Sequence, residues 1–136
     1  MLFTIPGIPC IYYGGEWGIS GVKENGSDDA LRPALSEPEW NELTDLISAL
    51  AKVHKENKAL LYGDYKSIVL CNRQLIFQRE FEGEKIWVSV NADEQAYQAH
   101  FHGMGSREVT ELLSGEKLIL NDSFTLPPFS FFIWKS

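Results

Sequence analysis

The order of apolar and polar residues separates an N-terminal part of the chain from a longer part with two-residue alternation. Residues 2–13 carry no charge, and such a continuous apolar run is typical of a short strand that is buried on both faces. Residues 14–35 follow with five glycines among Asn, Ser and Asp residues, a composition typical of a long loop. The sequence therefore predicts one buried strand that leads into an extended glycine-rich loop.

A helix is predicted after this loop, and the residues indicate both its start and its buried side. Ser36 fits the N-cap position, Pro38 fits the first turn, and Glu39 lies three residues after the cap, as in a capping box. Apolar residues then recur every three or four positions as far as Asn57. We expect the resulting stripe to be buried, and it consists of Trp40, Leu43, Leu46, Ile47, Leu50, Val53 and His54.

From residue 61 onward, apolar and polar residues alternate in short runs that are separated by turn residues, which predicts strands. Because no helical pattern interrupts these runs, they favour an antiparallel β-sandwich of about 75 residues. Trp87 and Trp134 lie in two of the runs, and packing in the core is their expected role. The expected strands span residues 65–71, 74–81, 85–91, 96–101, 108–113, 117–120 and 129–134.

The two parts differ in whether they can fold alone. A sandwich can close its own core, whereas one buried strand and one amphipathic helix cannot cover each other completely. We therefore expect residues 1–60 to be the end of a larger α/β domain and residues 61–136 to be a separate β-domain. Without the rest of that domain, the strand and helix should leave an exposed apolar surface. We therefore expect residues 1–31 to be disordered, to fold against the sandwich in another way, or to pair between chains in a homodimer through the strand and helix.

Length, composition and charge are those of an ordinary soluble globular protein. The chain has 136 residues, of which 44% are hydrophobic and 23% charged. Twelve Lys and Arg against nineteen Asp and Glu give a net charge of −7, which argues against nucleic-acid and membrane partners. Cys10 and Cys71 are too few for a disulfide framework, and the first residues do not have the pattern of a signal peptide. We therefore expect a cytoplasmic location.

Three motifs, in the right order, resemble the α-amylase family, glycoside hydrolase family 13. Residues 7–16, GIPCIYYGGE, resemble its strand-eight motif, in which Gly, six residues, Gly, one residue and Glu recur. Residues 28–33, DDALRP, are similar to the loop after that strand, and residues 54–65 are similar to the passage from the eighth helix into domain C. Residues 112–116 and 126–128 look like the last strands of domain C. The similarity is strongest to the neopullulanase, cyclomaltodextrinase and maltogenic amylase branch.

The resemblance implies a mainly β chain: an antiparallel β-sandwich like domain C, preceded by a strand-loop-helix remnant of a (β/α)8 barrel. Retaining glycosidases cleave with two carboxyl groups, which in this family lie, with a third carboxylate, on barrel strands four, five and seven. The resemblance places none of them in this chain. We therefore expect no catalytic residue, cofactor or metal site, and a structural role in covering the barrel of an enzyme that acts on an α-glucan or maltodextrin.

The resemblance also implies contacts with substrate in an intact parent enzyme. Asp28 and Arg32 match family residues that contact sugar hydroxyls, and an accepting carboxylate with a donating guanidinium can hold a vicinal diol. The alternative is an exposed ion pair that stiffens the loop. Glu16 matches the last residue of the strand-eight motif, with a solvated carboxylate as the alternative. Trp17 is a candidate sugar-stacking platform, or a filler between the barrel and domain C.

Two further interpretations remain open at this point. A stand-alone carbohydrate-binding β-sandwich with a helical lead-in is a different class of function, and it requires exposed aromatic side chains on the sandwich. His100 and His102 have the spacing of neighbours on one strand face, as in metal sites, but no third ligand lies near them in the sequence. A solvated loop edge is the alternative for this histidine pair.

Overall fold

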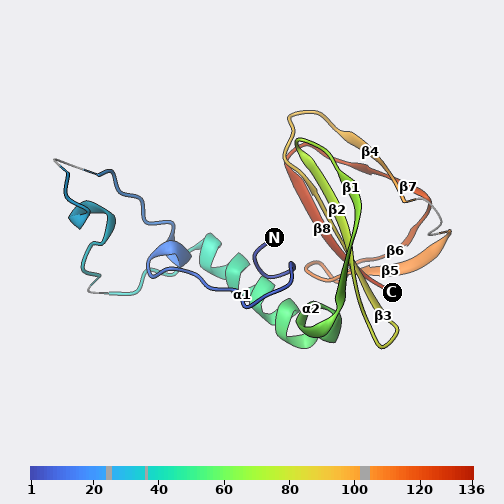
Figure 1. The fold of residues 1–136 in the computed structure, drawn as a ribbon, viewed down its shortest axis with the longest axis horizontal. Coiled ribbons are helices and arrows are strands. Elements are labelled where there is room, and N and C mark those ends of the chain that lie inside the picture. The colour runs from blue at the N-terminus through green and yellow to red at the C-terminus, as the bar shows by residue number, and fades with distance from the viewer. Residues whose placement is uncertain (24–25, 36, 102–104) are drawn as a thin grey trace.

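The computed structural model describes residues 1–23, 26–35, 37–101 and 105–136. Within these residues, two short 3-10 helices come first, two α-helices follow, and strands occupy the rest of the chain. Figure 1 shows the N-terminus, the end of α1 and helix α2 beside the β-domain, while the middle of the N-terminal segment and the start of helix α1 project away from it. The chain is therefore mainly β, as the sequence predicts.

The strands form a six-stranded sheet with the order β1-β2-β3-β8-β5-β6 and a two-stranded sheet of β4 and β7. All of these pairings are antiparallel, so the predicted antiparallel architecture is confirmed. The strands are β1 Asp64–Leu70, β2 Gln74–Phe81, β3 Glu84–Asn91, β4 Tyr97–His100, β5 Arg107–Glu111, β6 Lys117–Leu120, β7 Ser123–Leu126 and β8 Ser130–Lys135.

Strand β7 is the one strand of the described residues that the alternation pattern misses. Its surroundings, residues 121–128, contain Asn, Asp, Ser and two prolines and therefore predict a break between strands. In the structure, β7 pairs with β4 over four residues, from Tyr97 opposite Leu126 to His100 opposite Ser123. A four-residue strand beside turn residues has too little alternation to be recognised, so its partner strand decides its conformation.

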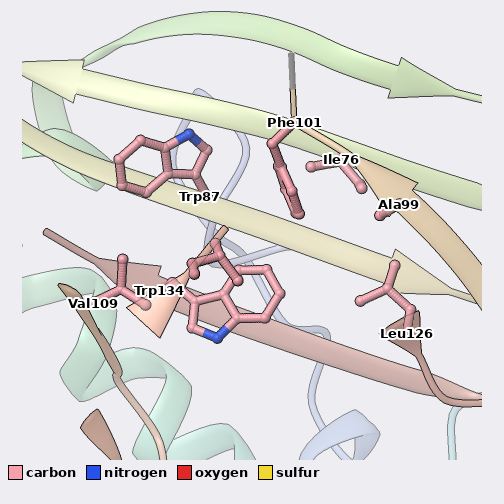
Figure 2. Close-up of a cluster of buried hydrophobic side chains, with 8 residues drawn as sticks. Ile76, Trp87, Ala99, Phe101, Val109, Leu126 and Trp134 are labelled. Atoms are coloured by element: carbon pink, nitrogen blue, oxygen red, sulfur yellow. The ribbon is translucent and has the colours of Figure 1, made fainter. Parts of the chain in front are cut away.

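The core consists of two clusters on opposite faces of the large sheet. Because successive side chains of a strand point to opposite faces, neighbours such as Ile133 and Trp134 belong to different clusters. Figure 2 shows the first cluster, in which Trp87 and Trp134 are buried as predicted. The first cluster contains Ile76, Trp87, Ala99, Phe101, Val109, Leu120, Leu126 and Trp134. The second contains Val53, Ala59, Leu60, Phe77, Ile86, Val88 and Ile133.

Helices α1, Glu42–Glu56, and α2, Lys58–Tyr62, contribute residues to the second cluster. The predicted boundary at residue 60 falls inside α2, where Ala59 and Leu60 are fully buried, and that boundary stays a prediction. No helix of the described residues is both long and apolar enough to span a bilayer.

The predicted start of helix α1 is wrong. Asn41 is the N-cap: its Oδ1 accepts from the Thr44 N–H at 3.1 Å, and its own N–H donates to Thr44 Oγ1 at 3.3 Å. Pro38 and Glu39 precede the helix, and Ser36 lies outside the described residues. Two capping sequences lie close together here, and the second one begins the helix, because its side chains complete both hydrogen bonds of a capping box.

The predicted strand over residues 2–13 does not form. Turns and bends occupy residues 2–7, and the Thr4 N–H donates to the Met1 carbonyl at 2.8 Å, which closes a local turn. A strand that is buried on both faces requires hydrogen-bonded neighbours on both sides. The described residues offer this segment no such neighbour, so it adopts turns instead.

The predicted apolar stripe of helix α1 is buried only near the end of the helix. Val53 and His54 are buried, whereas Leu43 and Leu46 are 39% and 38% exposed. Trp40, predicted to be in the core, lies before the helix and is 69% exposed, with its Nε1 donating to Asp45 Oδ1 at 2.8 Å. The start of the helix projects beyond the sheet, which explains both differences (Figure 1).

Candidate functional site

The predicted sugar-contacting pair lies on an exposed loop before helix α1. A single 3-10 turn, Asp29–Leu31, separates Asp28 from Arg32. Asp28 Oδ2 lies 4.0 Å from Arg32 Nη2, and Asp28 Oδ1 lies 3.0 Å from Lys23 Nζ. The structure therefore brings the pair together and adds Lys23, which the motif does not include. All three side chains are exposed, so the ion pairs by themselves stabilise the loop weakly.

A close backbone approach holds the two ends of this loop together. A Cβ atom on Gly21 would lie only 2.2 Å from the Ala30 carbonyl oxygen, so a glycine is required at this position. Lys23 and Asp28 belong to the segment that this contact closes. The loop thus has a defined path within its described residues, and the role of its charges in binding sugar stays a prediction.

Glu16 and Trp17 lie on a 3-10 helix, Gly15–Trp17, that contacts the start of helix α1. Thr44 Oγ1 donates to the Glu16 carbonyl at 2.9 Å, and Asn41 Nδ2 donates to the Trp17 carbonyl at 3.0 Å. The side chains that cap the helix therefore also hold this turn in place. Glu16 and Trp17 are themselves half-buried, and among the described residues no hydrogen bond or ion pair joins either of them to Asp28 or Arg32.

A buried arginine in the sandwich binds the backbone of the first residues. Arg79 on β2 is 1% exposed, and its Nη1 donates to the Thr4 carbonyl at 2.8 Å. Its Nη2 and Nε donate to the Gly63 carbonyl at 2.8 and 3.2 Å. Burial lowers the pKa of Arg79, and the charge of Asp64 partly offsets this shift. The motifs do not predict this contact, and the one signal for it is a charged residue at a core-facing position of a strand.

A second buried side chain, His54, binds the backbone of Phe3, the residue before Thr4. His54 Nδ1 lies 2.8 Å from the Phe3 carbonyl oxygen, and the two rings meet edge to face with centroids 6.5 Å apart. Ile5 packs against the second core cluster. We call His54, Arg79 and the carbonyl groups of Phe3, Thr4 and Gly63 the polar junction, because together they attach residues 3–5 to the helix and the sandwich.

An ion pair between Glu84 on β3 and Lys135 on β8 holds helix α2 against the sandwich. Glu84 Oε1 accepts from the Ala59 N–H at 2.8 Å, and Glu84 Oε2 accepts from Lys135 Nζ at 2.7 Å. Lys135 Nζ also donates to Asn57 Oδ1 at 2.9 Å. Burial alone would raise the pKa of Glu84, but the hydrogen bonds from Lys135 and Ala59 and the nearby lysine charges hold this pKa below its usual value.

A hollow of about 410 Å³ opens on the sandwich beside the turn between β5 and β6. We call it the aromatic hollow. Phe124 and Phe132 both pack against Trp134, with ring centroids 5.0 and 5.2 Å away, and the Phe132 and Trp134 rings are nearly parallel. Its lining residues are Glu111, Leu113, Ser114, Glu116, Leu118, Phe124, Phe131, Phe132 and Trp134.

The candidate histidine pair is only partly described. His100 lies on β4, and His102 lies outside the described residues. In the part of the chain that the structure describes, no three His, Cys, Asp or Glu side chains are grouped closely enough to hold a metal ion. Cys10 and Cys71 are exposed and do not form a disulfide.

Comparison with known proteins gives one family and several relatives. Residues 69–133 match the family model of the maltogenic amylase C-terminal domain. A cyclomaltodextrinase of Thermoanaerobacter pseudethanolicus is 33% identical over 91 residues, which are 65% of this chain and 15% of the relative. A cyclomaltodextrinase of Geobacillus thermopakistaniensis is 25% identical over 140 residues, covering 96% of this chain and 23% of the relative. An α-amylase from Anoxybacillus superposes with a TM-score of 0.81 at 24% identity, covering 98% of this chain and 30% of the other.

These likenesses confirm the resemblance that the three motifs predict. The chain spans less than a quarter of the length of the two cyclomaltodextrinases. Its likeness to the Anoxybacillus structure concerns the fold, and it includes the segment before the sandwich as well as the sandwich. The predicted fold class, a mainly β chain whose antiparallel sheets resemble the C-terminal domain of α-amylase-family enzymes, is therefore confirmed, although the predicted strand over residues 2–13 does not form.

Proposed function

This chain corresponds to the C-terminal part of an α-amylase-family enzyme, and from this premise we propose that it is the structural partner of a catalytic barrel. It covers apolar surface of the barrel and holds the segment that precedes the sandwich. The chain hydrolyses no glycoside by itself. The substrate of the complete enzyme is an α-glucan or a maltodextrin, a proposal that the names of the cyclomaltodextrinase relatives support.

The distribution of exposed apolar side chains carries this proposal. Before residue 47, eleven large apolar side chains are exposed, whereas most large apolar side chains of the strands pack in or against the two clusters. Exposed apolar surface of this extent is typical of an interface. We call these side chains the N-terminal apolar set: Met1, Leu2, Ile8, Tyr12, Tyr13, Ile19, Val22, Leu31, Trp40, Leu43 and Leu46.

The polar junction supports the same role. Arg79 and His54 bind backbone carbonyl groups of residues 3 and 4, so the sandwich and helix α1 both contact the start of the segment. Backbone carbonyl groups that accept from a buried arginine are costly to release, because the guanidinium would lose partners that water cannot replace. These bonds thereby fix the position of residues 3 and 4 relative to the sandwich.

The candidate sugar contacts belong to this proposal. In a (β/α)8 barrel, the active site is built from the loops at the carboxyl ends of the strands. The loop that carries Asp28 and Arg32 would supply a carboxylate and a guanidinium to sugar hydroxyls there, and Glu16 and Trp17 would lie at the edge of the same site. Lys23 Nζ lies 3.0 Å from Asp28 Oδ1, whereas Oδ2 has the longer 4.0 Å contact with Arg32, so Oδ2 would accept from a sugar hydroxyl beside the guanidinium.

A chimera tests the structural role directly. The part of the Geobacillus thermopakistaniensis cyclomaltodextrinase that matches this chain, 23% of that relative, is replaced by this chain. Soluble yield and cyclomaltodextrin hydrolysis are then measured. We expect a soluble, active chimera, and loss of soluble enzyme when the C-terminal part is omitted. A Leu46→Glu change in the chimera should lower soluble activity by about tenfold, because it puts a charge into an apolar interface.

Ile119→Glu is the matched control, since Ile119 is exposed on the sandwich and outside the N-terminal apolar set. This change should leave the chimera as active as its parent. Equal activity of the chimera with and without the C-terminal part would contradict the proposal, as would equal effects of the two Glu substitutions.

For the 136-residue chain on its own, we propose that a second copy covers part of the N-terminal apolar set. The exposed stripe at the start of helix α1 supports this, because Leu43 and Leu46 project from the same helix face. A homodimer would remove this apolar surface from water in the way that the barrel does in a complete enzyme.

A further inference from the structure

We propose that the aromatic hollow receives residues 8–12 of a second copy of this chain, which add as a short strand beside the first half of β8. The inference rests on the second copy proposed above, and it adds which segment of that copy is bound and where. Two observations from different ends of the chain support it. One is a free edge in the large sheet, and the other is an unpaired segment that is suited to form a strand.

The large sheet is interrupted beside β8. Strand β5 pairs with β8 only through Thr110 and Glu111. The Leu112 N–H still donates to the Ile133 carbonyl at 2.8 Å, and the chain then turns toward β6. Among the described residues, positions 130–132 of β8 therefore have β3 on one side and no strand on the other.

Phe131 carries the free backbone groups of this edge. The Ile133 backbone points toward β5, since its carbonyl accepts from Leu112 and its N–H donates to Glu111 Oε1 at 3.2 Å. Backbone groups of alternate residues in a strand point to the same side, so the Phe131 N–H and carbonyl face the open side. Within the described part of the chain, neither group has a hydrogen-bond partner there. One residue of an antiparallel neighbour can exchange two hydrogen bonds with Phe131.

The lining of the hollow indicates a gap in the plane of the sheet. Phe132 and Trp134 face the first cluster, whereas Phe131 points to the opposite face of β8, and all three line the hollow. A ligand lying on one face of the sheet would contact the side chains of that face only. An added strand contacts both faces, because its own side chains alternate between them. The hollow, of about 410 Å³, therefore fits an extended peptide.

Residues 8–12, Ile-Pro-Cys-Ile-Tyr, form neither a helix nor a strand in the single copy. Within the described residues, the one backbone group of this segment with a hydrogen-bond partner is the Tyr12 carbonyl, which accepts from the Gly15 N–H at 2.9 Å. Ile8 is 95% exposed, and isoleucine and tyrosine are favoured in strands. The segment carries no charge, so it adds no repulsion to Glu116 in the lining of the hollow.

Pro9 decides which residues of the segment face β8. Proline has no N–H, so Pro9 fits an added strand only where its backbone points away from β8. The backbone groups of Ile8 and Cys10 then point toward β8. Because Cys10 has segment residues on both sides, we place it opposite Phe131. Cys10 then shares a face of the sheet with Phe131, while Ile11 points to the other face.

Disulfide trapping tests this register. In a hydrogen-bonded antiparallel pair the two Cα atoms lie about 5.5 Å apart, within the range that a disulfide bridges. Phe131→Cys is made in a Cys71→Ser background, and the 136-residue chain is oxidised with glutathione disulfide. We expect a disulfide between Cys10 of one copy and the introduced thiol of the other. Non-reducing gel electrophoresis detects the cross-linked dimer, and peptide mass spectrometry locates the bond.

Ile119→Cys in the same background is the matched control, since Ile119 is 65% exposed on β6 but does not line the hollow. At equal protein concentration, Phe131→Cys should give about tenfold more of the dimer linked through Cys10 than this control, because docking holds the two thiols together. Peptide mapping separates this product from a disulfide between the Cys10 residues of two copies.

Ile8→Asp tests the segment without a disulfide. Because Ile8 is 95% exposed, this change leaves the folded chain intact. It should raise the dimer dissociation constant by about fivefold or more, since the charge would lie beside Phe131 on the added strand. Ile119→Asp should leave the dissociation constant unchanged. Light scattering after size-exclusion chromatography at several concentrations measures both variants.

Three results would overturn the docking while leaving the second copy in place: equal cross-linking from positions 131 and 119, a disulfide that forms within one copy, or an unchanged dissociation constant for Ile8→Asp. A parent chain that stays monomeric would contradict the second copy itself, and this docking with it. None of these outcomes bears on the structural role in the complete enzyme, which the chimera tests separately.

Discussion

Trp40 and Trp134 are the same kind of side chain but differ in burial, because they lie in different regions of this chain. Trp134 lies in β8, is fully buried, and packs against Phe124 and Phe132. Trp40 lies before helix α1 and is 69% exposed, with one hydrogen bond to Asp45. An apolar side chain of this protein is therefore buried only where the same chain provides a surface to cover it.

The sandwich provides such surfaces because its strands pair with one another. Strand β8 lies between β3 and β5, so its two faces contribute to two clusters. Residues 1–46 include an apolar run and the first part of an amphipathic helix, but no strand of the described residues pairs with this run. Their exposure is the physical reason for proposing a barrel, or a second copy, as the missing partner.

Truncation of the two tryptophans should give the largest difference in stability between the two regions. Trp134→Ala removes a ring from the centre of the first cluster and should lower the free energy of unfolding by about 3–5 kcal/mol. Trp40→Ala should lower it by no more than about 0.5 kcal/mol, because the ring is exposed. Urea unfolding monitored by circular dichroism measures both values. If Trp134→Ala does not fold, Trp134→Phe serves as the milder change, and equal losses for the two sites would contradict the assignment of the core.

The polar junction should show the next largest effect. Arg79→Met removes three hydrogen bonds to the Thr4 and Gly63 carbonyls and should lower the free energy of unfolding by about 2–4 kcal/mol. Hydrogen exchange at Thr4 and Ile5 should become faster, since the segment loses its contact with the sandwich. Arg73→Met is the control, because Arg73 is exposed and pairs with Asp93 at 3.7 Å. Unchanged exchange at Thr4 in the Arg79 variant would show that the junction does not hold the segment.

Self-association should respond to helix α1 while stability changes little. The double substitution of Leu43 and Leu46 by Glu adds charge to an exposed apolar face, so it should shift the isolated chain toward monomer. The free energy of unfolding should change by only about 0.5 kcal/mol for each exposed site. Light scattering after size-exclusion chromatography at several concentrations measures the mass. A monomeric parent chain, or a dimer that survives both substitutions, would contradict the proposed second copy.

The ion pair at Glu84 should have a small effect on the free energy of unfolding, and this effect should depend on pH. Glu84→Gln should cost about 1 kcal/mol at neutral pH, through weaker bonds to Lys135 and the Ala59 N–H. The folded-state pKa of Glu84 lies below its usual value of 4.5, so the added stability is complete above that value. It is lost as the pH falls through the folded-state pKa.

The unfolding curves of the parent chain and the Glu84→Gln variant should therefore converge in acid. Glu82→Gln is the control, since Glu82 is 69% exposed and its contact with Lys58 is 3.8 Å long. A stability difference for Glu84→Gln that stays constant from neutral to acidic pH would show that the pair does not depend on the carboxylate charge.

The candidate site shows which features a sequence can predict. The motif places Asp28 and Arg32 four positions apart on one loop, and a single turn brings their charges within 4.0 Å. The contact of Arg79 with Thr4 spans 75 positions, and no local pattern predicts it. The aromatic hollow cannot be predicted from local sequence patterns either, because it lies where β5 stops pairing with β8. Strand pairing is a property of the folded sheet.

By itself, the sequence determined most of the strands, the antiparallel character of the sandwich and the family resemblance. Alternation and turn residues are local, since they depend only on whether neighbouring side chains face the core or water. The tertiary structure alone decided the pairing of β7, the insertion of β8 between β3 and β5, the true start of α1 and the exposure of the N-terminal apolar set. These features depend on contacts between residues that are distant in the sequence. Whether an apolar segment is buried depends on the surface that covers it, and the segment's own sequence does not contain that information.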